Sequence, residues 1–399
     1  MTRSFTPLAA LLSSSRATKL SVAAAAGALL LARYTYRRFT VKNEWHLKGK
    51  VAIVTGGSRG VGRGVCLELG RAGATVYVVG RSRAGGPNNL PGQVLKGEAL
   101  PGTIDSVTEE VCRAGGIGIA CPCDCSSDED MAHVIATVRN MQGRLDILVN
   151  CAIMIRDDVR QKPPYWEQEI EVYDSYHNVG TRSTYVMTTL ATPLMLQSPP
   201  PLTSTTATGA APALIVNVSS PGSYRYLFNV AYGVGKSGLD RIGKDMNVDL
   251  RRDHTNISIV TLHPGVVKTE RMMEHADGFR KRMHINVDLG ETVTYTGRVV
   301  CALAANPKEA RKVSGKVITC TEVASWLNFT DVDGRRPADP MTLAFLLTNV
   351  LPSMLFPASS SSRLKKSNES NTISSASQLS ASDQQQAGAA PETTATSVE

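Results

Sequence analysis

The stretch that decides the fold is VAIVTGGSRGVGRGVCLELGRAGATVYVVG, residues 51–80. It opens on an apolar, β-branched run, passes through a loop of glycines, continues with apolar positions at helical spacing and closes on a second β-branched run. Strands that are apolar at every position are typical of a parallel sheet covered on both faces. Strand, glycine loop, helix and second strand in this order predict a βαβ unit that binds a pyrophosphate at the start of its helix.

The glycine loop supplies the residues for that binding. Glycine lets the backbone come close to a phosphate, and a helix N-terminus presents free N–H groups and a partial positive charge. A tight turn without a ligand is the alternative. We predict that the loop contacts a dinucleotide through Thr55, Gly56, Ser58, Gly60 and Gly62.

The end of the second strand bears on which dinucleotide is bound. A carboxylate there would accept hydrogen bonds from a free ribose 2′-hydroxyl, but this strand ends in Gly80 and Arg81. With Arg59 in the glycine loop, two guanidinium groups can grip a 2′-phosphate. The pattern favours NADP(H) over NAD(H), and the alternative is that both arginines face solvent.

Short apolar runs alternate with helical patterns through the rest of the body. Together with the first two, the predicted strands are residues 51–55, 75–79, 117–121, 145–150, 213–219, 257–262 and 316–320. This alternation predicts an α/β protein, a single doubly wound Rossmann domain with a seven-stranded, mainly parallel sheet. Two insertions rich in Pro, Gly, Ser or Thr, residues 82–103 and 197–212, are predicted surface loops.

Charge is concentrated at the N-terminus of the 399-residue chain. Residues 1–43 hold seven basic side chains and no acidic one, out of a net charge of +8. The remainder is therefore nearly neutral. A basic face for nucleic acid is not expected on such a body.

Composition divides the chain into four parts. Residues 1–45 form a basic, Ser-rich extension whose apolar run, residues 20–32, is too short to span a bilayer. A transit peptide, a signal anchor or an unstructured extension would fit, which predicts a mitochondrial or endoplasmic reticulum membrane location. Residues 46–335 form the Rossmann domain. Residues 336–358 are an apolar segment, either a docked helix or a membrane-surface segment, and residues 359–399 are a predicted disordered tail.

The eight cysteines are scattered without a secreted-scaffold spacing, which is typical of reduced thiols in an intracellular protein. CPCDC, residues 121–125, is the one cluster. Its alternate spacing puts three sulfurs on one side of a strand, where buried cysteine acts as a small apolar group. We favour that interpretation over a metal site, because no second Cys or His pair stands nearby at ligand spacing.

A second functional signal lies in NVAYGVGKSGLD, residues 229–240. Tyr232 and Lys236 are four positions apart, so on a helix the phenol and the ammonium lie on one face and can address one bound molecule. A chance pairing on a helix is the alternative.

Combined, the glycine loop and the Tyr-x-x-x-Lys pair resemble the short-chain dehydrogenase/reductase superfamily, over roughly residues 49–320. The stretches VSSPGSYRYLFNVAYGVGK, NVG, YWE and DVDGR further resemble one subgroup of that superfamily. The resemblance implies a catalytic set of Asn178, Ser220, Tyr232 and Lys236. Asn178 would hold a water of a proton relay and Ser220 would bind the carbonyl, although a one-residue slip to Ser219 is open.

The same resemblance implies further cofactor contacts. Asp124 would bond the adenine ring, and Asn150 would lie beside the adenosine ribose. In HPGVVKTE, residues 263–270, Thr269 would bond the nicotinamide amide and Val267 would offer a backbone contact. The remaining implied contacts are Pro264 and Gly265 of that segment, together with Tyr232 and Lys236.

One stretch departs from the superfamily. NCAI, residues 150–153, has Ile153 where the superfamily usually has glycine. We expect the added bulk to lie near the adenosine side of the cofactor and to leave the reacting groups untouched.

The chemistry explains why these residue types belong together. Transfer of a hydride to a carbonyl carbon builds negative charge on the oxygen, which then needs a proton and hydrogen bonds. Tyr232 would give the proton, and the Lys236 cation is expected to lower the phenol pKa. Ser220 would orient the carbonyl.

The sequence therefore predicts an NADP(H)-dependent oxidoreductase that interconverts a carbonyl and an alcohol. Met272, Met273, Phe279 and Met283 could line an apolar pocket, which favours a lipophilic small molecule, although core packing explains them equally well. Contact with a membrane surface and a homo-oligomer are open. The alternative is a catalytically weak dinucleotide-binding interaction protein at a membrane.

Overall fold

The computed structural model describes residues 45–86, 94–95, 98–155, 163–198 and 212–339, together with residues 342, 345 and 350. Three predicted parts therefore lie wholly or mostly outside the described residues. These are the N-terminal extension, the apolar segment near the C-terminus and the tail.

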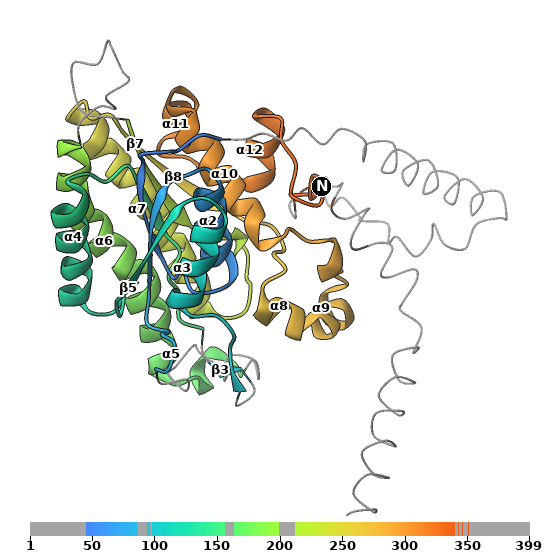
Figure 1. Cartoon of the computed structure of the whole chain (residues 1–399). Coiled ribbons are helices and arrows are strands. Elements are labelled where there is room, and N and C mark those ends of the chain that lie inside the picture. Colours follow the sequence, from blue (N-terminus) through green and yellow to red (C-terminus); the bar gives the residue numbers. More distant parts are fainter. Residues whose placement is uncertain are drawn as a thin grey trace, which may run out of the picture.

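A seven-stranded sheet forms the centre of the molecule (Figure 1). Its order is β5-β2-β1-β6-β7-β8-β9, and every neighbouring pair is parallel. The chain winds outward from β1 in both directions, so the predicted doubly wound α/β fold is confirmed. The strands are β1 (Val51–Thr55), β2 (Thr75–Gly80), β5 (Ile117–Pro122), β6 (Ile147–Asn150), β7 (Ala213–Val218), β8 (Ile257–His263) and β9 (Val317–Thr319).

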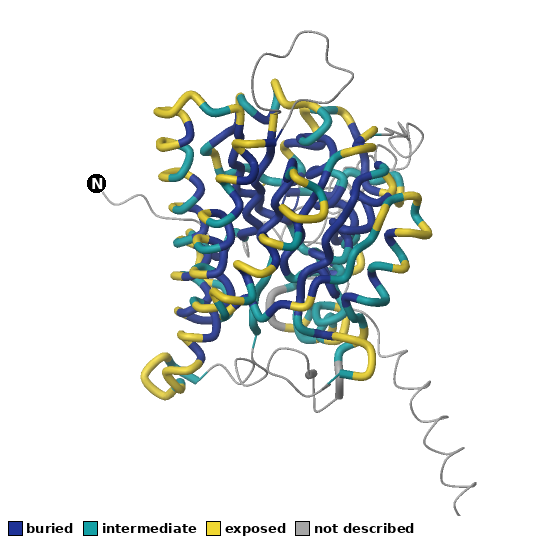
Figure 2. Tube along the Cα trace, turned by 60° about the vertical axis from the view of Figure 1, so that its left-hand side comes forward, coloured by how far each residue is buried: buried dark blue, intermediate teal, exposed yellow. Residues whose placement is uncertain are grey.

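Alternate residues of the central strands enter two separate cores. Val54 and Val78 face one core, whereas Ile53 and Tyr77 face the other. Figure 2 shows the buried residues gathered in the sheet and on the inner sides of the helices. Both faces are thus covered, which is why these strands are apolar at every position.

Helices cover both faces of the sheet (Figure 1). The first face carries α2 (Gly60–Arg71), α3 (Ile104–Arg113), α10 (Val293–Ala305), α11 (Pro307–Val313) and α12 (Cys320–Trp326). The second face carries α4 (Asp128–Gln142), α6 (Ser183–Gln197) and α7 (Val230–Arg252).

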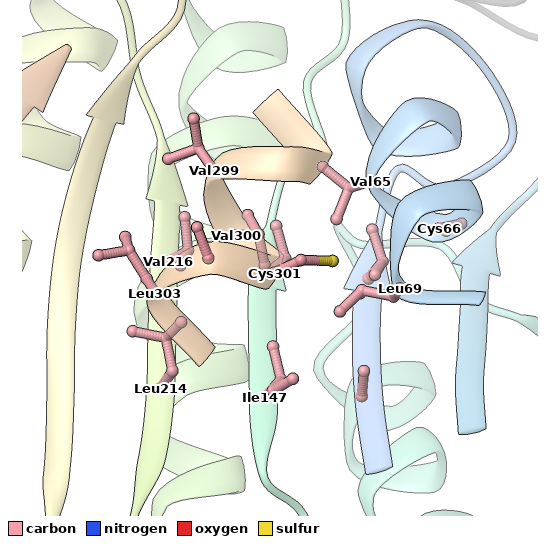
Figure 3. Packing of buried hydrophobic residues seen from close by; sticks show 14 of the residues in the cluster. Val65, Cys66, Leu69, Ile147, Leu214, Val216, Val299, Val300, Cys301 and Leu303 are labelled. Atoms are coloured by element: carbon pink, nitrogen blue, oxygen red, sulfur yellow. The ribbon is translucent and has the colours of Figure 1, made fainter. Parts of the chain in front are cut away.

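On the first face, α2 and α10 lie in unusually close contact. The Cys301 side chain of α10 points toward Leu69 of α2, and Val65 of α2 lies beside the same crossing (Figure 3). The approach is possible because Gly64 has no side chain: a Cβ there would lie 1.8 Å from the carbonyl oxygen of Val293. The two helices therefore pack backbone against backbone at this crossing.

Shorter elements complete the described chain. They are β3 (Val94–Leu95), β4 (Glu98–Ala99), η3 (Tyr165–Glu167), α5 (Ile170–Tyr176), η4 (His177–Arg182), η5 (Pro221–Ser223), α8 (Glu270–Glu274), α9 (Ala276–Met283) and η6 (Val287–Leu289). Strands β3 and β4 pair antiparallel inside the predicted loop of residues 82–103. The η4 segment is a turn of π-helix that joins α5 to α6.

Strand register brings the predicted functional segments to one edge of the sheet. Thr55 pairs with Asn150, Asn150 with Asn217, and Asn217 with Thr261, so the carboxyl ends of β1, β6, β7 and β8 lie side by side. Ligands of doubly wound sheets bind outside these ends, where the strand order reverses. Here the reversal lies between β1 and β6.

Candidate active site

Tyr232 and Ser220 meet at this edge. Asn229 caps α7 by accepting a hydrogen bond from the Tyr232 N–H at 2.7 Å, so the phenol stands in the first turn of the helix. Its hydroxyl donates to Ser220 Oγ at 2.7 Å. Gly222 makes room for the ring, because a Cβ there would lie 2.4 Å from Tyr232 Cε1. The geometry selects Ser220 over Ser219, whose hydroxyl donates instead to the Lys236 carbonyl at 3.2 Å.

Lys236 lies one turn further along α7 and is buried with Tyr232. Its Nζ donates to the carbonyl of Val218 at 3.0 Å and lies 5.7 Å from the centroid of the Tyr232 ring. The structure therefore places the phenol and the ammonium on one helix face, as the spacing predicts. They share a small cavity that is also lined by Gly180 and Thr181.

The expected effect of Lys236 on the phenol is not found. Burial raises the pKa of Tyr232 to about 12, and the hydrogen bond to Ser220 only partly offsets this. Burial also lowers the pKa of Lys236 to about 8, although nearby Cys151 and Asp240 act in the opposite direction. The predicted lowering of the Tyr232 pKa is therefore wrong for this structure, because loss of hydration outweighs the charge of an ammonium that is committed to a carbonyl.

Aromatic and aliphatic side chains hold the phenol in place. Tyr176 and Phe228 contact the Tyr232 ring edge to face, with centroids 5.8 and 4.9 Å away. Ile153 packs against the same cluster. The expectation that Ile153 leaves the reacting groups untouched is therefore wrong, because the chain turns after β6 and carries this side chain to the phenol.

Asn178 lies at the protein surface. It is exposed on the π-helical turn η4, whereas Gly180 and Thr181 of the same turn line the cavity beside Lys236. Thr181 Oγ1 donates to the carbonyl of Gly235 at 3.1 Å. The assignment of Asn178 as the holder of a relay water therefore stays a prediction.

The glycine loop follows β1 at the same edge. Gly56 and Gly60 have φ of +67° and +54°, and a Cβ at Gly62 would lie 2.2 Å from the Gly56 carbonyl oxygen. Thr55 Oγ1 accepts from the N–H groups of Cys151 and Ala152 at 3.1 and 3.2 Å. The loop is therefore fixed against the segment after β6, with Ser58 buried inside it.

The segment after β8 lies over the start of α2. A Cβ at Gly60 would lie 3.3 Å from Thr269 Cγ2, and Glu270 Oε2 accepts a hydrogen bond from the Gly60 N–H at 3.1 Å. At its other end, Gly265 N–H donates to Oε1 of the buried Glu291 at 2.8 Å. Val267 lies between these contacts, and Pro264 directly precedes Gly265. The two predicted cofactor segments thus meet at the helix N-terminus.

These features fit a dinucleotide. The loop has the positive φ angles and missing side chains that a close phosphate requires, and the first N–H of α2 already receives an anionic oxygen, from Glu270. Thr55, Gly56, Ser58, Gly60 and Gly62 would hold the pyrophosphate.

The predicted 2′-phosphate ligands lie near one another at the end of β2, but both have protein partners. Arg59 donates to Ser82 Oγ at 2.9 Å and to the Gly102 carbonyl at 2.8 Å. Burial lowers the pKa of Arg59, with Arg81 among the groups that act in the same direction. Arg81 lies 3.7 Å from the carboxylate of Asp124. Asp124, the predicted adenine ligand, is thus at the same end of the site.

Asn150 is turned into the protein. Its amide donates to Thr188 Oγ1 and to Asn217 Oδ1, both at 3.0 Å, and the residue is buried. Its side chain thus links β6 to β7 and α6 by hydrogen bonds.

Sequence reasoning missed Asp240, His263, Glu270 and Glu291. Asp240 follows Lys236 by one helical turn, and His263 directly precedes the Pro264–Gly265 pair, so position along the chain could have flagged both. Nothing local marks Glu270 or Glu291, whose partners are 210 and 26 residues away in sequence.

The predicted position of the cysteine cluster is addressed within the described residues. Cys121, Cys123 and Cys125 are all buried in the second core, and no group of three His, Cys, Asp or Glu side chains in the described ranges is arranged to hold a metal ion. In those same ranges, every helix is too short or too polar to cross a membrane.

Comparison with known proteins identifies the family. A family profile described as Enoyl-(Acyl carrier protein) reductase matches residues 99–321. Dehydrogenase/reductase SDR family member 1 of Homo sapiens is 35% identical over 315 residues, which cover 76% of this chain and 90% of the human protein. The chain belongs to the short-chain dehydrogenase/reductase family. The resemblance seen in the sequence is confirmed, and this short-chain dehydrogenase/reductase is a member of an oxidoreductase family.

Solved structures have the same fold. A dehydrogenase from Xanthomonas campestris superposes with a TM-score of 0.58 at 23% identity, covering 74% of this chain and 95% of its own. A 7 alpha-hydroxysteroid dehydrogenase in complex with NADH and 7-oxo glycochenodeoxycholic acid superposes with a TM-score of 0.52 at 20% identity, covering 69% of this chain and 93% of its own. At these identities the likeness concerns the fold of this short-chain dehydrogenase/reductase.

Proposed function

We propose that this protein is an NADP(H)-dependent oxidoreductase that interconverts a carbonyl and an alcohol on a lipophilic small molecule. One observation carries the proposal. The Tyr232 hydroxyl donates to Ser220 Oγ at 2.7 Å, with Lys236 one helical turn away, at the sheet edge where the glycine loop opens α2.

The reacting residues have separate roles in this proposal. A bound reduced nicotinamide supplies the hydride. Ser220 donates a hydrogen bond to the substrate oxygen and orients the carbonyl carbon. Tyr232 gives its proton to that oxygen. Burial supports this role in reduction, because a phenol whose pKa is about 12 still holds its proton at neutral pH.

Lys236 would hold the nicotinamide ribose and bring positive charge to the developing phenolate. With a pKa of about 8, its amine is mostly protonated at pH 7 and loses its charge as the pH rises further. We therefore expect reduction to slow above about pH 8.

The preference for NADP(H) rests on the cations at the end of β2. Arg59 and Arg81 lie close enough to influence one another, and the strand ends in Gly80 without a carboxylate of its own. A 2′-phosphate would compete with Asp124 for Arg81, while Arg59 keeps its contacts to Ser82 and Gly102.

The substrate class rests on aromatic contacts near the phenol. Phe279 of α9 contacts Phe228 edge to face, with centroids 6.3 Å apart, and Phe228 contacts Tyr232. Apolar side chains thus lead from α9 to the reacting hydroxyl. They favour a lipophilic carbonyl compound over a small, highly polar one.

The test is reduction of a panel of carbonyl compounds by the full chain, followed as loss of NADPH absorbance. Tyr232→Phe removes the proton donor and should lower kcat/KM by about 10²- to 10⁴-fold, the usual contribution of a general acid. Tyr226→Phe is the matched control, because Tyr226 is exposed. Turnover that survives Tyr232→Phe would contradict the catalytic assignment. Tighter binding of NADH than of NADPH would contradict the roles of Arg59 and Arg81.

One observation favours a second candidate, a catalytically weak dinucleotide-binding interaction protein at a membrane. Asn178 is exposed and is not among the residues that line the small cavity beside Lys236, where a relay water would be held. Tight NADPH binding with no turnover across the panel would favour this candidate.

For the location, we keep the proposal that residues 1–45 direct the chain to a mitochondrial or endoplasmic reticulum membrane. The basic, acid-free composition of residues 1–43 supports it. Fractionation of cells that express the full chain, or a chain lacking residues 1–43, is the test.

A further inference from the structure

A buried Asp–His pair lies directly behind the reacting residues. His263 Nε2 lies 3.0 and 3.2 Å from the two carboxylate oxygens of Asp240, and both residues are buried. Asp240 is on α7, one turn beyond Lys236, and His263 is the last residue of β8. An Nε2–H that donates to the carboxylate fits this geometry.

The carboxylate is ionised although it is buried. Burial alone would raise the pKa of Asp240, but the hydrogen bond from His263, together with contacts to Ser223 and Ser219, holds it below its usual range. Ser219 also donates to the Lys236 carbonyl, so it ties the same turn of α7 to the end of β7. A negative charge is therefore fixed one turn from the Lys236 ammonium.

That negative charge acts on Lys236 at neutral pH. Cys151 and Asp240 both oppose the effect of burial on Lys236. Burial raises the pKa of Cys151 to about 11, so its thiol is neutral near pH 7 and exerts no charge there. Asp240 keeps its charge throughout this range.

Several elements bring titratable groups to this region. Besides Lys236 and Asp240 themselves, they are Tyr232 of α7, Cys151 after β6, His263 of β8 and Tyr224 after η5. The Tyr224 ring stacks on His263 with centroids 5.7 Å apart, and burial raises its pKa, with Asp339, Asp240 and Glu322 contributing in the same direction. Tyr224 is thus uncharged near neutral pH.

We propose that Asp240 and His263 are a positioning pair for the reaction. The carboxylate, held by the imidazole, keeps the buried Lys236 amine in its charged form. The same contact ties the helix of Tyr232 and Lys236 to the start of residues 264–269, the predicted nicotinamide segment. The effect on catalysis rests on the proposed function, whereas the effect on Lys236 does not.

The direct test is the titration of Lys236, followed by NMR of the full chain with ¹³Cε-labelled lysine and assigned through Lys236→Met. Asp240→Asn keeps the shape and removes the charge. We expect the midpoint to fall by about one pH unit from the wild-type value of about 8. Asp245→Asn is the matched control, because Asp245 lies on the exposed side of the same helix and pairs with Arg241. It should leave the midpoint unchanged.

The catalytic test uses NADPH with benzil as the carbonyl probe. Because a midpoint lowered by about one unit empties the charged form mainly at higher pH, kcat/KM of Asp240→Asn should fall about fivefold at pH 8 and less than about twofold at pH 6. A purely structural role would lower kcat/KM equally at both pH values, and that outcome would overturn the proposal. An unchanged Lys236 midpoint would overturn it as well.

His263 provides a rescue test. His263→Gln keeps an N–H donor for Asp240 and should retain the wild-type midpoint. His263→Phe removes the donor, so the buried carboxyl should take up a proton and the midpoint should fall as in Asp240→Asn. If His263→Phe does not fold, a shifted midpoint in His263→Gln is the result that contradicts the role of the imidazole. If neither wild type nor any variant reduces benzil or the carbonyl panel, only the proposed function fails. The Lys236 titration midpoints still show whether Asp240 and His263 keep the Lys236 amine charged.

Discussion

The two sides of the candidate site are built in different ways. The glycine-loop side consists mainly of backbone, with positive φ at Gly56 and Gly60 and no space for a side chain at Gly62. The phenol side consists of ionisable side chains, Tyr232 and Lys236, that are buried among groups from several elements. The shape of the first side depends on the path of the backbone. The charge state of the second side depends on the groups that surround each ionisable side chain.

This difference decides how each side responds to change. A steric constraint on backbone is absolute, because no rotamer can relieve a clash between a Cβ and a carbonyl oxygen. The charge state of a buried group is a balance between lost hydration and neighbouring charges, so it shifts by degrees. Substitutions on the two sides should therefore differ in size and in pH dependence.

The largest effect on cofactor binding is expected on the glycine-loop side. In Gly62→Ala, the new Cβ would lie 2.2 Å from the Gly56 carbonyl oxygen, so the loop must move. Displacing the loop should weaken NADPH binding on the order of 100-fold, which is about 2.7 kcal/mol. Fluorescence titration of NADPH gives the Kd. In the control, Gly233→Ala on α7, the nearest contact is an ordinary 3.4 Å, and Kd should change less than about twofold. Equal Kd values for the two variants would remove the contrast.

An intermediate effect is expected at Ile153. Ile153→Ala removes packing from the Tyr232 cluster, and the loosened phenol should lower kcat/KM about tenfold. NADPH affinity should stay the same, since the side chain lies on the phenol side. Steady-state kinetics and Kd are measured together, with Ile119→Ala, half-buried against the second core, as the control. A weaker NADPH affinity with unchanged kcat/KM would return Ile153 to the adenosine side.

A smaller effect is expected where the two sides meet. Glu270→Gln removes the negative charge of a carboxylate that accepts a hydrogen bond from the Gly60 N–H. An anionic pyrophosphate would no longer compete with it, so NADPH should bind about fivefold more tightly. Glu274→Gln, an exposed position on the same short helix, is the control for net charge. Weaker binding in Glu270→Gln would mean that this carboxylate supports the cofactor instead.

The last effect concerns stability and not binding or turnover. Burial raises the pKa of Glu291 from an ordinary 4.5 to about 8. Between these pH values the folded chain holds a proton that the unfolded chain has lost, so Glu291 lowers stability progressively as pH rises through this window. Glu291→Gln can still accept the Gly265 hydrogen bond.

Its melting temperature should therefore match wild type near pH 4.5 and exceed it by a few degrees at pH 8, for a gain of about 2 kcal/mol. Differential scanning calorimetry at both pH values is the measurement, with the exposed Glu109→Gln as control. A gain of equal size at both pH values would show that the proton is not its cause.

The same contrast explains what could be predicted from the sequence. The seven strands and the glycine loop were predicted because they depend on local properties of the sequence. These are the apolar runs of the strands and the glycines of the loop that follows residues 51–55. The direction of the Tyr232 pKa was predicted wrongly, because it depends on burial that involves Tyr176 and Ile153, which are distant in sequence.

The crossing of α2 and α10 has a consequence far from its own location. A methyl group at Gly64 would lie 1.8 Å from the Val293 carbonyl oxygen, and one at Gly297 would lie 2.6 Å from the Gly64 carbonyl oxygen. Helix α2 starts at the glycine loop, and α10 starts two residues after Glu291, which holds Gly265. Inherited or engineered changes at Gly64 or Gly297 would thus disturb both ends of the cofactor site at once, and would resemble active-site lesions in an assay although neither residue belongs to the site.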